Sequence, residues 1–430
     1  MNLRPIVAAS VVGFVVIACG PEQNAPDTDG TWVGTITTEG NVTTVVNESG
    51  SVWGGTARLV EEASIGVEAG DDPYMLGRVT GIAADGERIY VADAQVPAIR
   101  IYDRSGTFIG NLGREGSGPG EYRYPAGVGV DASGRVYTMD STTGRLLMYS
   151  RDGEPLATSM PLPCCRIGSS YLLVTPDGQP YVSGVWRRQR PAAAADAEDE
   201  RVRGLMAFSL DGTVGEVIEQ PELPLPPISI VASDGRMVSS APAPFQPRPV
   251  VSYVPNGAML SGYSDVYRFE VRHPDGRRII VERSWDPAPV SAEEAAAARR
   301  GATAYMRQRD PQWQWNVEEM PATKPPFFDL AGGLQEEAWV IRYEAGAPIP
   351  DCLFEEQRAT EQDMTPCFHE PRIVDVFDPH GRYLGAFDLP DGFRLNPRPW
   401  IDGETVIART EDEAGTIMVK RYRLVLPGER

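Results

Sequence analysis

Six positions of this 430-residue chain share one place in a recurring pattern, and their side chains could surround a ligand. Each lies three residues after the central aromatic or aliphatic residue of a short apolar segment: Asp93, Asp140, Gly184, Tyr263, Arg342 and Thr410. Paired carboxylates supply the hard oxygen ligands that Ca²⁺ prefers, and they also act as general acid and base. Asp93 and Asp140 are therefore candidates for a Ca²⁺ site or for catalysis, with Tyr263 and Arg342 as further ligand contacts.

Two tryptophans offer a second way to hold a ligand. Trp313 and Trp315 alternate with polar residues in the segment QWQWN, and their rings could stack on a sugar or on an aromatic ligand. Isolated tryptophan pairs more often serve packing. We therefore favour a role in anchoring the preceding segment to the body of the protein.

The histidines and cysteines argue against a zinc enzyme. His273 and His380 occupy equivalent turns in different repeats, so they cannot converge on one ion, and His369 is the only other histidine. The cysteines lack the CxxC-like spacing of zinc sites. The chain also has no GxSxG nucleophile motif with a partner histidine and no phosphate-binding loop.

Four cysteines follow the N-terminal segment, an even number that fits disulfide bonds in an oxidising compartment. Cys352 and Cys367 lie in one apparent loop, so we predict that they pair. Cys164 and Cys165 are neighbours, and they could form a strained vicinal bridge, stay reduced or pair elsewhere.

The N-terminal segment predicts export. Arg4 precedes the apolar stretch 6–18, which is too short to span a bilayer but has the length of a signal-peptide hydrophobic region. Residues 16–20, VIACG, resemble the lipobox of bacterial lipoproteins. This resemblance implies that Cys19 carries a lipid that anchors the chain to a membrane, and Gly20 favours the outer membrane in a diderm host. The alternative is an ordinary signal peptide with a chance cysteine.

An internal repeat indicates the fold class. Residues 81–106 and 127–153 each contain alternating apolar segments around two glycine turns, which predicts two β-hairpins, or one four-stranded propeller blade. The turn glycine of the first hairpin recurs six times, at Gly86, Gly134, Gly178, Gly257, Gly333 and Gly403. That of the second recurs five times, at Gly106, Gly153, Gly212, Gly276 and Gly381. The last blade thus lacks its outermost strand, and we predict that residues 57–65 supply it and close the ring.

One part of the repeat resembles a known family. Residues 116–122, GSGPGEY, and the segments 125–131 and 134–137 resemble the repeat of NHL-type six-bladed propellers over residues 79–156. The resemblance implies an all-β, six-bladed β-propeller in which a strand-end aspartate satisfies turn amides, and it favours this structural role for Asp93 and Asp140. The later repeats are similar to exported bacterial propeller lipoproteins of mostly unassigned function. The three-histidine site of NHL-like amidating lyases is missing from this sequence, so that activity is not implied.

These patterns divide the chain into a signal peptide (1–18), a disordered tether (19–30), a β-hairpin (31–56) and a propeller (57–430), with blades at about 79–112, 125–160, 171–218, 249–285, 327–388 and 398–426. Four long insertions, 185–204, 219–248, 285–326 and 343–371, fall on one face by topology, and loops on a rigid scaffold are where binding usually resides. Ser291 followed by Glu294 forms a capping-box pattern, which predicts a helix between blades four and five.

The charge balance excludes one class of partner. Sixty acidic and 40 basic residues give a net charge of −20, which does not suit a nucleic-acid surface. Two hypotheses remain. We favour a monomeric binding module that docks a glycan, peptide or partner protein on the face with the insertions, because no nucleophile–base pair emerges. The alternative is a hydrolase or lyase, assisted by Ca²⁺, with Asp93, Asp140 and Arg342 at the channel mouth.

Overall fold

The computed structural model describes residues 32–161, 172–188, 200–226, 228–233, 238–317, 320–352, 354 and 365–429. The predicted signal peptide (1–18) and tether (19–30), the lipidation site Cys19, and the pair Cys164 and Cys165 lie outside the described residues. In the described part of the chain, no helix is long and apolar enough to cross a membrane.

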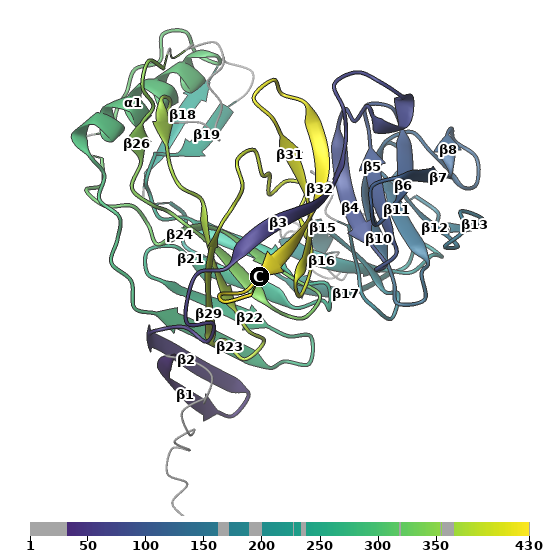
Figure 1. The fold of residues 1–430 in the computed structure, drawn as a ribbon, viewed down its shortest axis with the longest axis horizontal. Helices are drawn as coiled ribbons and strands as arrows, with labels where there is room; N and C mark the ends of the chain where they lie inside the picture. The colour runs from purple at the N-terminus through teal and green to yellow at the C-terminus, as the bar shows by residue number, and fades with distance from the viewer. Residues whose placement is uncertain are drawn as a thin grey trace, which may run out of the picture.

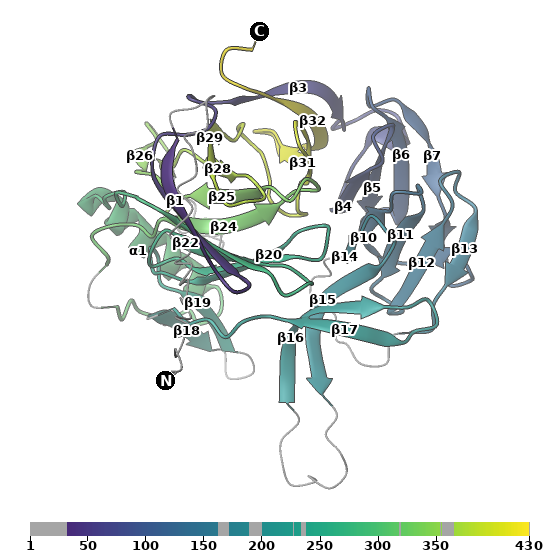
Figure 2. The same cartoon turned by 90° about the horizontal axis from the view of Figure 1, so that it is seen from below.

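Six antiparallel blades surround a channel, which confirms the predicted all-β, six-bladed propeller (Figures 1 and 2). Blades one to three contain, from the channel outward, β4 (Val79–Ala84), β5 (Arg88–Asp93), β6 (Ala98–Asp103) and β7 (Phe108–Leu112); β10 (Pro125–Val130), β11 (Val136–Asp140), β12 (Arg145–Tyr149) and β13 (Pro155–Thr158); and β14 (Leu172–Val174), β15 (Pro180–Arg188), β16 (Glu200–Phe208) and β17 (Val214–Glu219). Blades four to six contain β20 (Pro249–Tyr253), β21 (Met259–Tyr263), β22 (Arg268–Arg272) and β23 (Arg278–Arg283); β24 (Phe327–Gly332), β25 (Ala338–Arg342), β28 (Ile373–Phe377) and β29 (Tyr383–Asp388); and β30 (Trp400–Asp402), β31 (Thr405–Glu411), β32 (Ile417–Val425) and β3 (Arg58–Ile65).

Shorter elements lie between the blade strands. They are the 3-10 helix η1 (Asp72–Tyr74), the parallel pair β8 (Arg114–Glu115) and β9 (Glu121–Tyr122), the hairpin β18 (Ser229–Ser233) and β19 (Val238–Pro242), the helix α1 (Ala292–Arg307), and the pair β26 (Ala347–Pro348) and β27 (Phe368–His369). In blade three, β15 and β16 extend beyond the ring (Figure 2), so part of the insertion predicted at 185–204 continues the sheet.

Glycine turns connect the strands within the blades. One of the eleven glycines predicted at these turns is wrong. Ten of the eleven turn glycines have positive φ, a conformation that glycine adopts at little cost. The exception is Gly333. In blade two, Gly134 N donates to Asp131 O, and in blade five Glu336 N donates to Gly333 O, with Glu336 at φ 63°. Glu336 therefore holds the turn-glycine position of blade five, and Gly333 holds that of Asp131.

The N-terminal ribbon, residues 33–65, covers the outer edges of three consecutive blades. The hairpin of β1 (Val33–Glu39) and β2 (Val42–Ser49) adds to blade four, because β2 pairs in parallel with β23. Trp53 N then donates to Leu384 O, and Ala57 N to Ala386 O, along the outer strand of blade five. Finally β3 pairs with β32 and completes blade six, as the repeat count predicts. Unpaired strand edges are thus satisfied over half of the ring.

Asn47 fixes the ribbon to two blades at once. Its side-chain oxygen accepts hydrogen bonds from Trp32 Nε1 at 2.8 Å and from Tyr383 N at 2.7 Å. Its amide nitrogen donates to Glu282 O and to Gly381 O, both at 3.1 Å. Asn47 is 3% exposed, and its two hydrogen bonds to blade five are fully buried, where an unmade hydrogen bond is costly.

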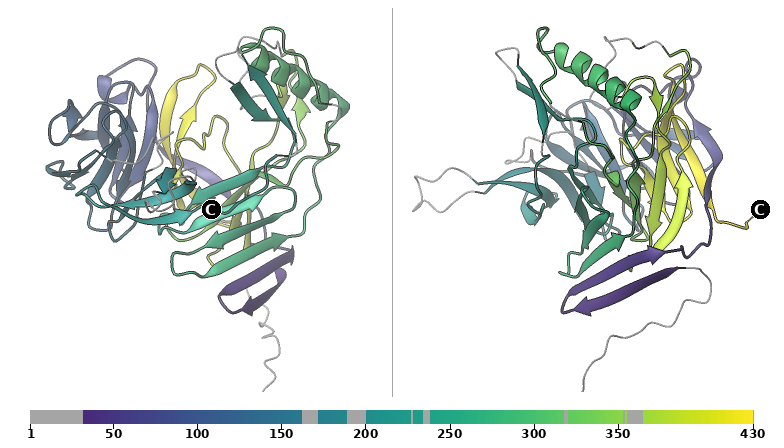
Figure 3. Two further views of the ribbon diagram at one scale, coloured as in Figure 1. Left: turned by 180° about the vertical axis from the view of Figure 1, so that it is seen from behind. Right: turned by 90° about the vertical axis from the view of Figure 1, so that its left-hand side faces the viewer.

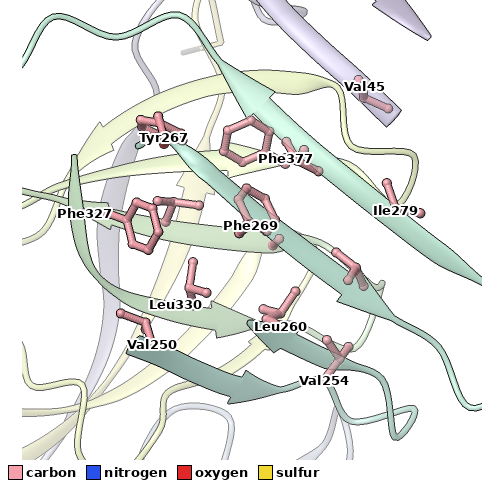
Figure 4. Packing of buried hydrophobic residues seen from close by; sticks show 14 of the residues in the cluster. Val45, Val250, Val254, Leu260, Tyr267, Phe269, Ile279, Phe327, Leu330 and Phe377 are labelled. Carbon is pink, nitrogen blue, oxygen red and sulfur yellow. The ribbon is translucent and has the colours of Figure 1, made fainter. Parts of the chain in front are cut away.

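An aromatic cluster joins blades four and five (Figure 4). Tyr267 and Phe269 of blade four pack against Phe327 and Phe377 of blade five, with the Phe269 and Phe377 rings edge to face at 5.2 Å. Val45 of the ribbon completes the cluster from outside. Edge-to-face pairs add about 0.5–1.5 kcal/mol to the effect of burial alone.

Candidate ligand site at the channel mouth

The inner strands surround a channel with a cavity volume of about 100 Å³. Its wall is mostly backbone and apolar side chains, and blades one and two approach so closely that a Cβ on Gly81 would lie 2.6 Å from the Cα of Gly127. Among the described residues that line it, only Arg398 is charged. Polar recognition must therefore come from the two ends of the channel.

Asp93 is fully engaged within blade one. Its carboxylate accepts hydrogen bonds from the amides of Gly77, Arg78 and Gln95 at 2.9 to 3.0 Å, and pairs with Arg100 at 2.7 Å. Burial alone would raise the pKa of Asp93, but these hydrogen bonds outweigh it, so the pKa is below its usual value. The geometry is that of a carboxylate that holds a turn.

Asp140 has the same environment in blade two. It accepts hydrogen bonds from Tyr124 N and Thr142 N, both at 3.1 Å, and from Thr143 Oγ1 at 2.7 Å. Asp93 and Asp140 are both 0% exposed. Within the described ranges, no three His, Cys, Asp or Glu side chains gather so that they could hold a metal ion.

Tyr263 and Arg342 are engaged elsewhere. The Tyr263 hydroxyl donates to Leu225 O at 3.2 Å. Arg342 pairs within blade five, 3.1 Å from Glu344 and 3.4 Å from Asp375, and stacks over Trp285, which follows the last strand of blade four, at 4.5 Å. No hydrogen bond or ion pair joins any two of the four predicted channel-mouth residues, so the structure does not bring them together as one site.

Asp375 is the centre of a buried polar cluster between blades four and five. It accepts hydrogen bonds from the hydroxyls of Tyr267 at 2.6 Å and Tyr383 at 3.1 Å, and it pairs with Arg283 at 2.6 Å. Arg283 also stacks over the Tyr383 ring at 3.9 Å. Asp375 is 0% exposed, so this cluster joins blades rather than presenting a surface to a ligand.

We use the term loop-bearing face for the end of the ring with the blade-to-blade connections, and cap for the structure that stands on it. The cap consists of the hairpin β18–β19, helix α1 and the segment 313–317, and Figures 1 and 3 place it above blades four and five, at the end of the molecule away from the β1–β2 hairpin. It has its own core, in which Ile230 and Ala241 of the hairpin pack against Ala302 and Met306 of the helix.

A buried lysine attaches the cap to blade five. Lys324 Nζ lies 2.6 Å from Glu294 of α1 and 2.7 Å from Glu370, and donates to Glu344 O at 2.6 Å. Lys324 is 2% exposed. Burial raises the pKa of Glu370, although Lys324 opposes the effect. Ser291 Oγ accepts the amide of Glu294 as predicted, but the Glu294 carboxylate pairs with Lys324 instead of closing the capping box.

The two tryptophans belong to the cap. Trp313 is 6% exposed and donates from Nε1 to Val231 O at 2.9 Å, so its ring packs between the hairpin and α1. Trp315 is half-buried, donates to Val317 O at 2.7 Å, and lies under Arg299. Their positions match the anchoring role that the sequence favours.

Four arginines gather at the loop-bearing end of the channel, where blades five and six meet. They are Arg372 before β28, Arg394 and Arg398 between β29 and β30, and Arg409 in β31, and we call them the mouth arginines. Arg398 pairs with Asp329 at 2.9 Å. Arg394 pairs with Glu411 at 2.6 Å, and Arg409 pairs with the same carboxylate. Three of the four guanidinium groups thus share two carboxylates.

Arg372 has no carboxylate partner among the described residues. Its guanidinium donates to Phe393 O at 2.6 Å. Burial and the neighbouring Arg394 lower the pKa of Arg372. The exposed Asp391 of the same loop forms no ion pair with any mouth arginine in the described part of the chain. Two further groups here have no hydrogen-bond partner: Arg409 Nε and the hydroxyl of Thr410, which is 2% exposed.

The remaining predicted residues lie apart from this cluster. Cys352 and Cys367 form a disulfide bond with a Cα–Cα distance of 5.4 Å, in the insertion of blade five. His273 is buried and His380 exposed in turns at the other end of the ring, whereas His369 lies in β27 on the loop-bearing face.

The sequence contained partial signals for the parts that were not predicted. The alternation around Asp234-Gly235 is a hairpin pattern, and it marks β18 and β19 within the proline-rich connection. Lys324 is one of only two lysines in the chain, an unusual choice at its position. The mouth arginines had no such signal, because they come from three separate segments.

The comparison with known families agrees with the fold. A family described as 6-bladed beta-propeller matches residues 65–177. No curated protein matches this chain. Among solved structures, the chain is similar to a putative exported protein of Bacteroides fragilis, with 11% identity, coverage of 86% of this chain and 95% of that chain, and a TM-score of 0.43.

Two further structures are similar at the same level. A member of the DUF4221 family from Bacteroides vulgatus has 8% identity, with 86% of this chain and 99% of that chain covered and a TM-score of 0.47. A virginiamycin B lyase of Staphylococcus aureus has 9% identity, with 84% and 98% covered and a TM-score of 0.34. The function of this chain must therefore be argued from its own residues.

Proposed function

We propose that this protein is an exported, lipid-anchored propeller that binds a glycan, a peptide or a partner protein on its loop-bearing face. Export and the lipid on Cys19 rest on the N-terminal sequence. The binding role rests on the cap and on the charged channel mouth beside it.

The observation that carries the proposal is that the cap is a built structure. It has a hydrophobic core of its own, and a lysine with two glutamates is buried where it meets blade five. Burying such charges is costly unless the geometry is well defined, and a segment that only connects two blades needs neither feature. A rigid cap on a rigid ring is the usual arrangement of a binding site.

Binding can be tested on immobilised glycan and peptide libraries with the purified protein, followed by calorimetric titration of the best ligand. We expect a ligand that binds one to one. Replacing the hairpin segment 229–242 by a short Gly/Ser linker should abolish binding, while the ring stays folded in a thermal melt. The matched control replaces the β1–β2 turn at Gly40 and Asn41, which lies away from the cap, and should bind normally. Unchanged binding without the cap hairpin would refute the proposal.

Anchoring can be tested by labelling cells with a radioactive fatty acid. The label should appear on the wild-type chain, which should fractionate with membranes. Cys19→Ser should remove the label and release the protein from the membrane fraction. A labelled Cys19→Ser chain, or an unlabelled wild-type chain, would leave an ordinary signal peptide as the explanation of residues 1–18.

A further inference from the structure

We propose that the mouth arginines bind an anionic group of the ligand, a carboxylate or a phosphate, at the junction of blades five and six. This inference rests on the proposed binding function and specifies the chemistry that the loop-bearing face recognises.

The first argument is local charge. Elsewhere in the ring, several arginines have a carboxylate of their own, as in Arg135 with Asp131 and Arg151 with Asp85, and others share one, as Arg421 and Arg423 share Glu62. At the channel mouth, Arg394 and Arg409 share Glu411, Arg398 pairs with Asp329, and Arg372 has no carboxylate partner among the described residues. The chain as a whole is acidic, with a net charge of −20, yet positive charge is in excess at this place. Like charges repel in the free protein, and a bound anion would neutralise them.

The second argument is access. The side chains of Arg394, Arg398 and Arg409 are 47%, 26% and 22% exposed, so part of each guanidinium faces solvent. Arg398 also lines the channel. The planar fork of arginine matches carboxylate and phosphate oxygens with two parallel hydrogen bonds. An anion at the mouth could therefore be held by more than one arginine while the rest of the ligand lies on the channel or the cap.

The third argument is that some polar groups at this junction lack an ion-pair partner or a hydrogen-bond partner. Arg372 has no carboxylate within the described residues, Arg409 Nε has no acceptor, and the hydroxyl of the buried Thr410 has no partner. Buried polar groups in native proteins are nearly always hydrogen-bonded. Two groups without a hydrogen-bond partner, Arg409 Nε and the Thr410 hydroxyl, and one guanidinium without a carboxylate, that of Arg372, mark this junction as a place that an anion would complete.

The test is calorimetric titration of the purified protein with citrate and with inorganic phosphate, at low and at high NaCl, with glucose as the neutral solute. We expect one of the two anions to bind with an affinity that falls at high salt, and glucose not to bind. The better anion identifies the group that is recognised. Arg394→Gln combined with Arg398→Gln should weaken binding about 10- to 100-fold.

Two further variants separate recognition from structure. Arg277→Gln is the matched control, because Arg277 is an exposed arginine paired with Asp275 at 2.7 Å at the other end of the ring, and it should leave anion binding unchanged. Arg372→Met should weaken anion binding and raise the melting temperature of the free protein, since it removes an unpaired half-buried charge. A purely structural Arg372 would instead give a lower melting temperature.

Several results would overturn the inference: neither anion binds to the wild type, all variants bind equally, or Arg277→Gln weakens binding as much as the mouth variants. If a library ligand still binds under those conditions, only the anion site is wrong and the proposed function stands. If the library ligand also fails to bind, the proposed function is wrong as well.

Discussion

Blades one and two differ from blades five and six at the same topological position. At the end of the second strand, Asp93 and Asp140 accept amides of the residues that precede their own first strands. In blade five, Arg342 occupies this position and forms ion pairs with Glu344 and Asp375, although its Nε has no hydrogen-bond partner, and in blade six Thr410 occupies it with an unpartnered hydroxyl. At this position the carboxylates of the first pair of blades are fully hydrogen-bonded, whereas the second pair leaves polar groups without a hydrogen-bond partner.

The edges of the blades differ in the same way. The N-terminal ribbon covers the outer edges of blades four, five and six, and it crosses no edge of blades one to three. The cap and the mouth arginines also belong to the second half of the ring. The comparison indicates that regular blades provide a scaffold, and that irregular blades, held by long-range contacts, present the candidate site.

The largest effect should come from the lysine that holds the cap. Lys324→Met leaves Glu294 and Glu370 buried without a cation, so we expect a loss of about 3–5 kcal/mol in the stability of the cap. Hydrogen exchange in α1 and a thermal melt would measure it. The control is Lys420→Met, the other lysine, whose partly exposed pair with Glu61 should matter by no more than about 0.5 kcal/mol. Equal effects would mean that the cap is not held by this contact.

The next effect concerns the ribbon. Asn47→Ala removes four hydrogen bonds, two of them fully buried, and leaves backbone groups of blades four and five unsatisfied, so we expect a loss of about 2–3 kcal/mol in the free energy of unfolding by urea. The matched control is Asn41→Ala in the same hairpin, where one exposed hydrogen bond to Gly276 O should contribute little. If Asn47→Ala were as mild as the control, the ribbon would not be a structural part of these blades.

The pH dependence of stability should differ between blades two and five, because of the turn that joins the first two strands of each blade. Arg135 follows the turn glycine in blade two and pairs with Asp131, whereas Glu337 follows Glu336 in blade five and is 7% exposed. Burial raises the pKa of Glu337 to about 7, and Asp402 contributes in the same direction. Because this pKa lies above the usual value of 4.5, the ionised group reduces stability above pH 7, and the reduction disappears as the pH falls toward 4.5.

Glu337→Gln should therefore stabilise the protein on the order of 1–3 kcal/mol at pH 8, and by nearly nothing near the usual pKa of glutamate. Thermal melts of variant and wild type across this range would measure the difference. Glu404→Gln, an exposed change in the adjacent turn of blade six, should show no such dependence. A flat difference for Glu337→Gln would contradict the assigned environment.

The smallest effect tests the turn conformations. Glu336 has φ 63°, so Glu336→Gly relieves backbone strain but removes a hydrogen bond from Asn256, and we expect a net stabilisation below about 1 kcal/mol. Gly134→Ala at φ 82° should have the opposite sign and cost about 1 kcal/mol or more. Chemical unfolding of both variants would compare them. The same sign for both would show that Glu336 does not hold the glycine position.

The regular blades were predictable because their information is local. The turn glycines, the strand-end aspartates and the alternation of apolar residues in 79–156 are each fixed by contacts within a few residues or one neighbouring strand. The count of six hairpins against five also predicted closure by residues 57–65. The alignment failed at Gly333, although the spacing of three residues between Gly134 and Tyr137 recurs between Glu336 and Trp339 and would have located the turn.

The candidate site was not predictable in the same way. Arg342 was expected at the channel mouth by its place in the repeat, but a strand-end side chain faces whichever group offers a partner, and its partners are Asp375 of the adjacent strand and the ring of Trp285. The mouth arginines come from positions that share no repeat register. Their proximity depends on how the loops of blades five and six fold back on the ring.

The sequence by itself determined the ring of six blades, the closing strand and the face that carries the insertions, because period-two hydrophobicity and glycine turns act over short distances. Only the tertiary structure decided which polar groups are satisfied and which remain open. Lys324 forms ion pairs with two glutamates from separate insertions, and Asn47 forms hydrogen bonds with two blades. Arg372 has no carboxylate partner among the described residues. These outcomes depend on contacts between residues far apart in the chain, where neither periodicity nor spacing carries information.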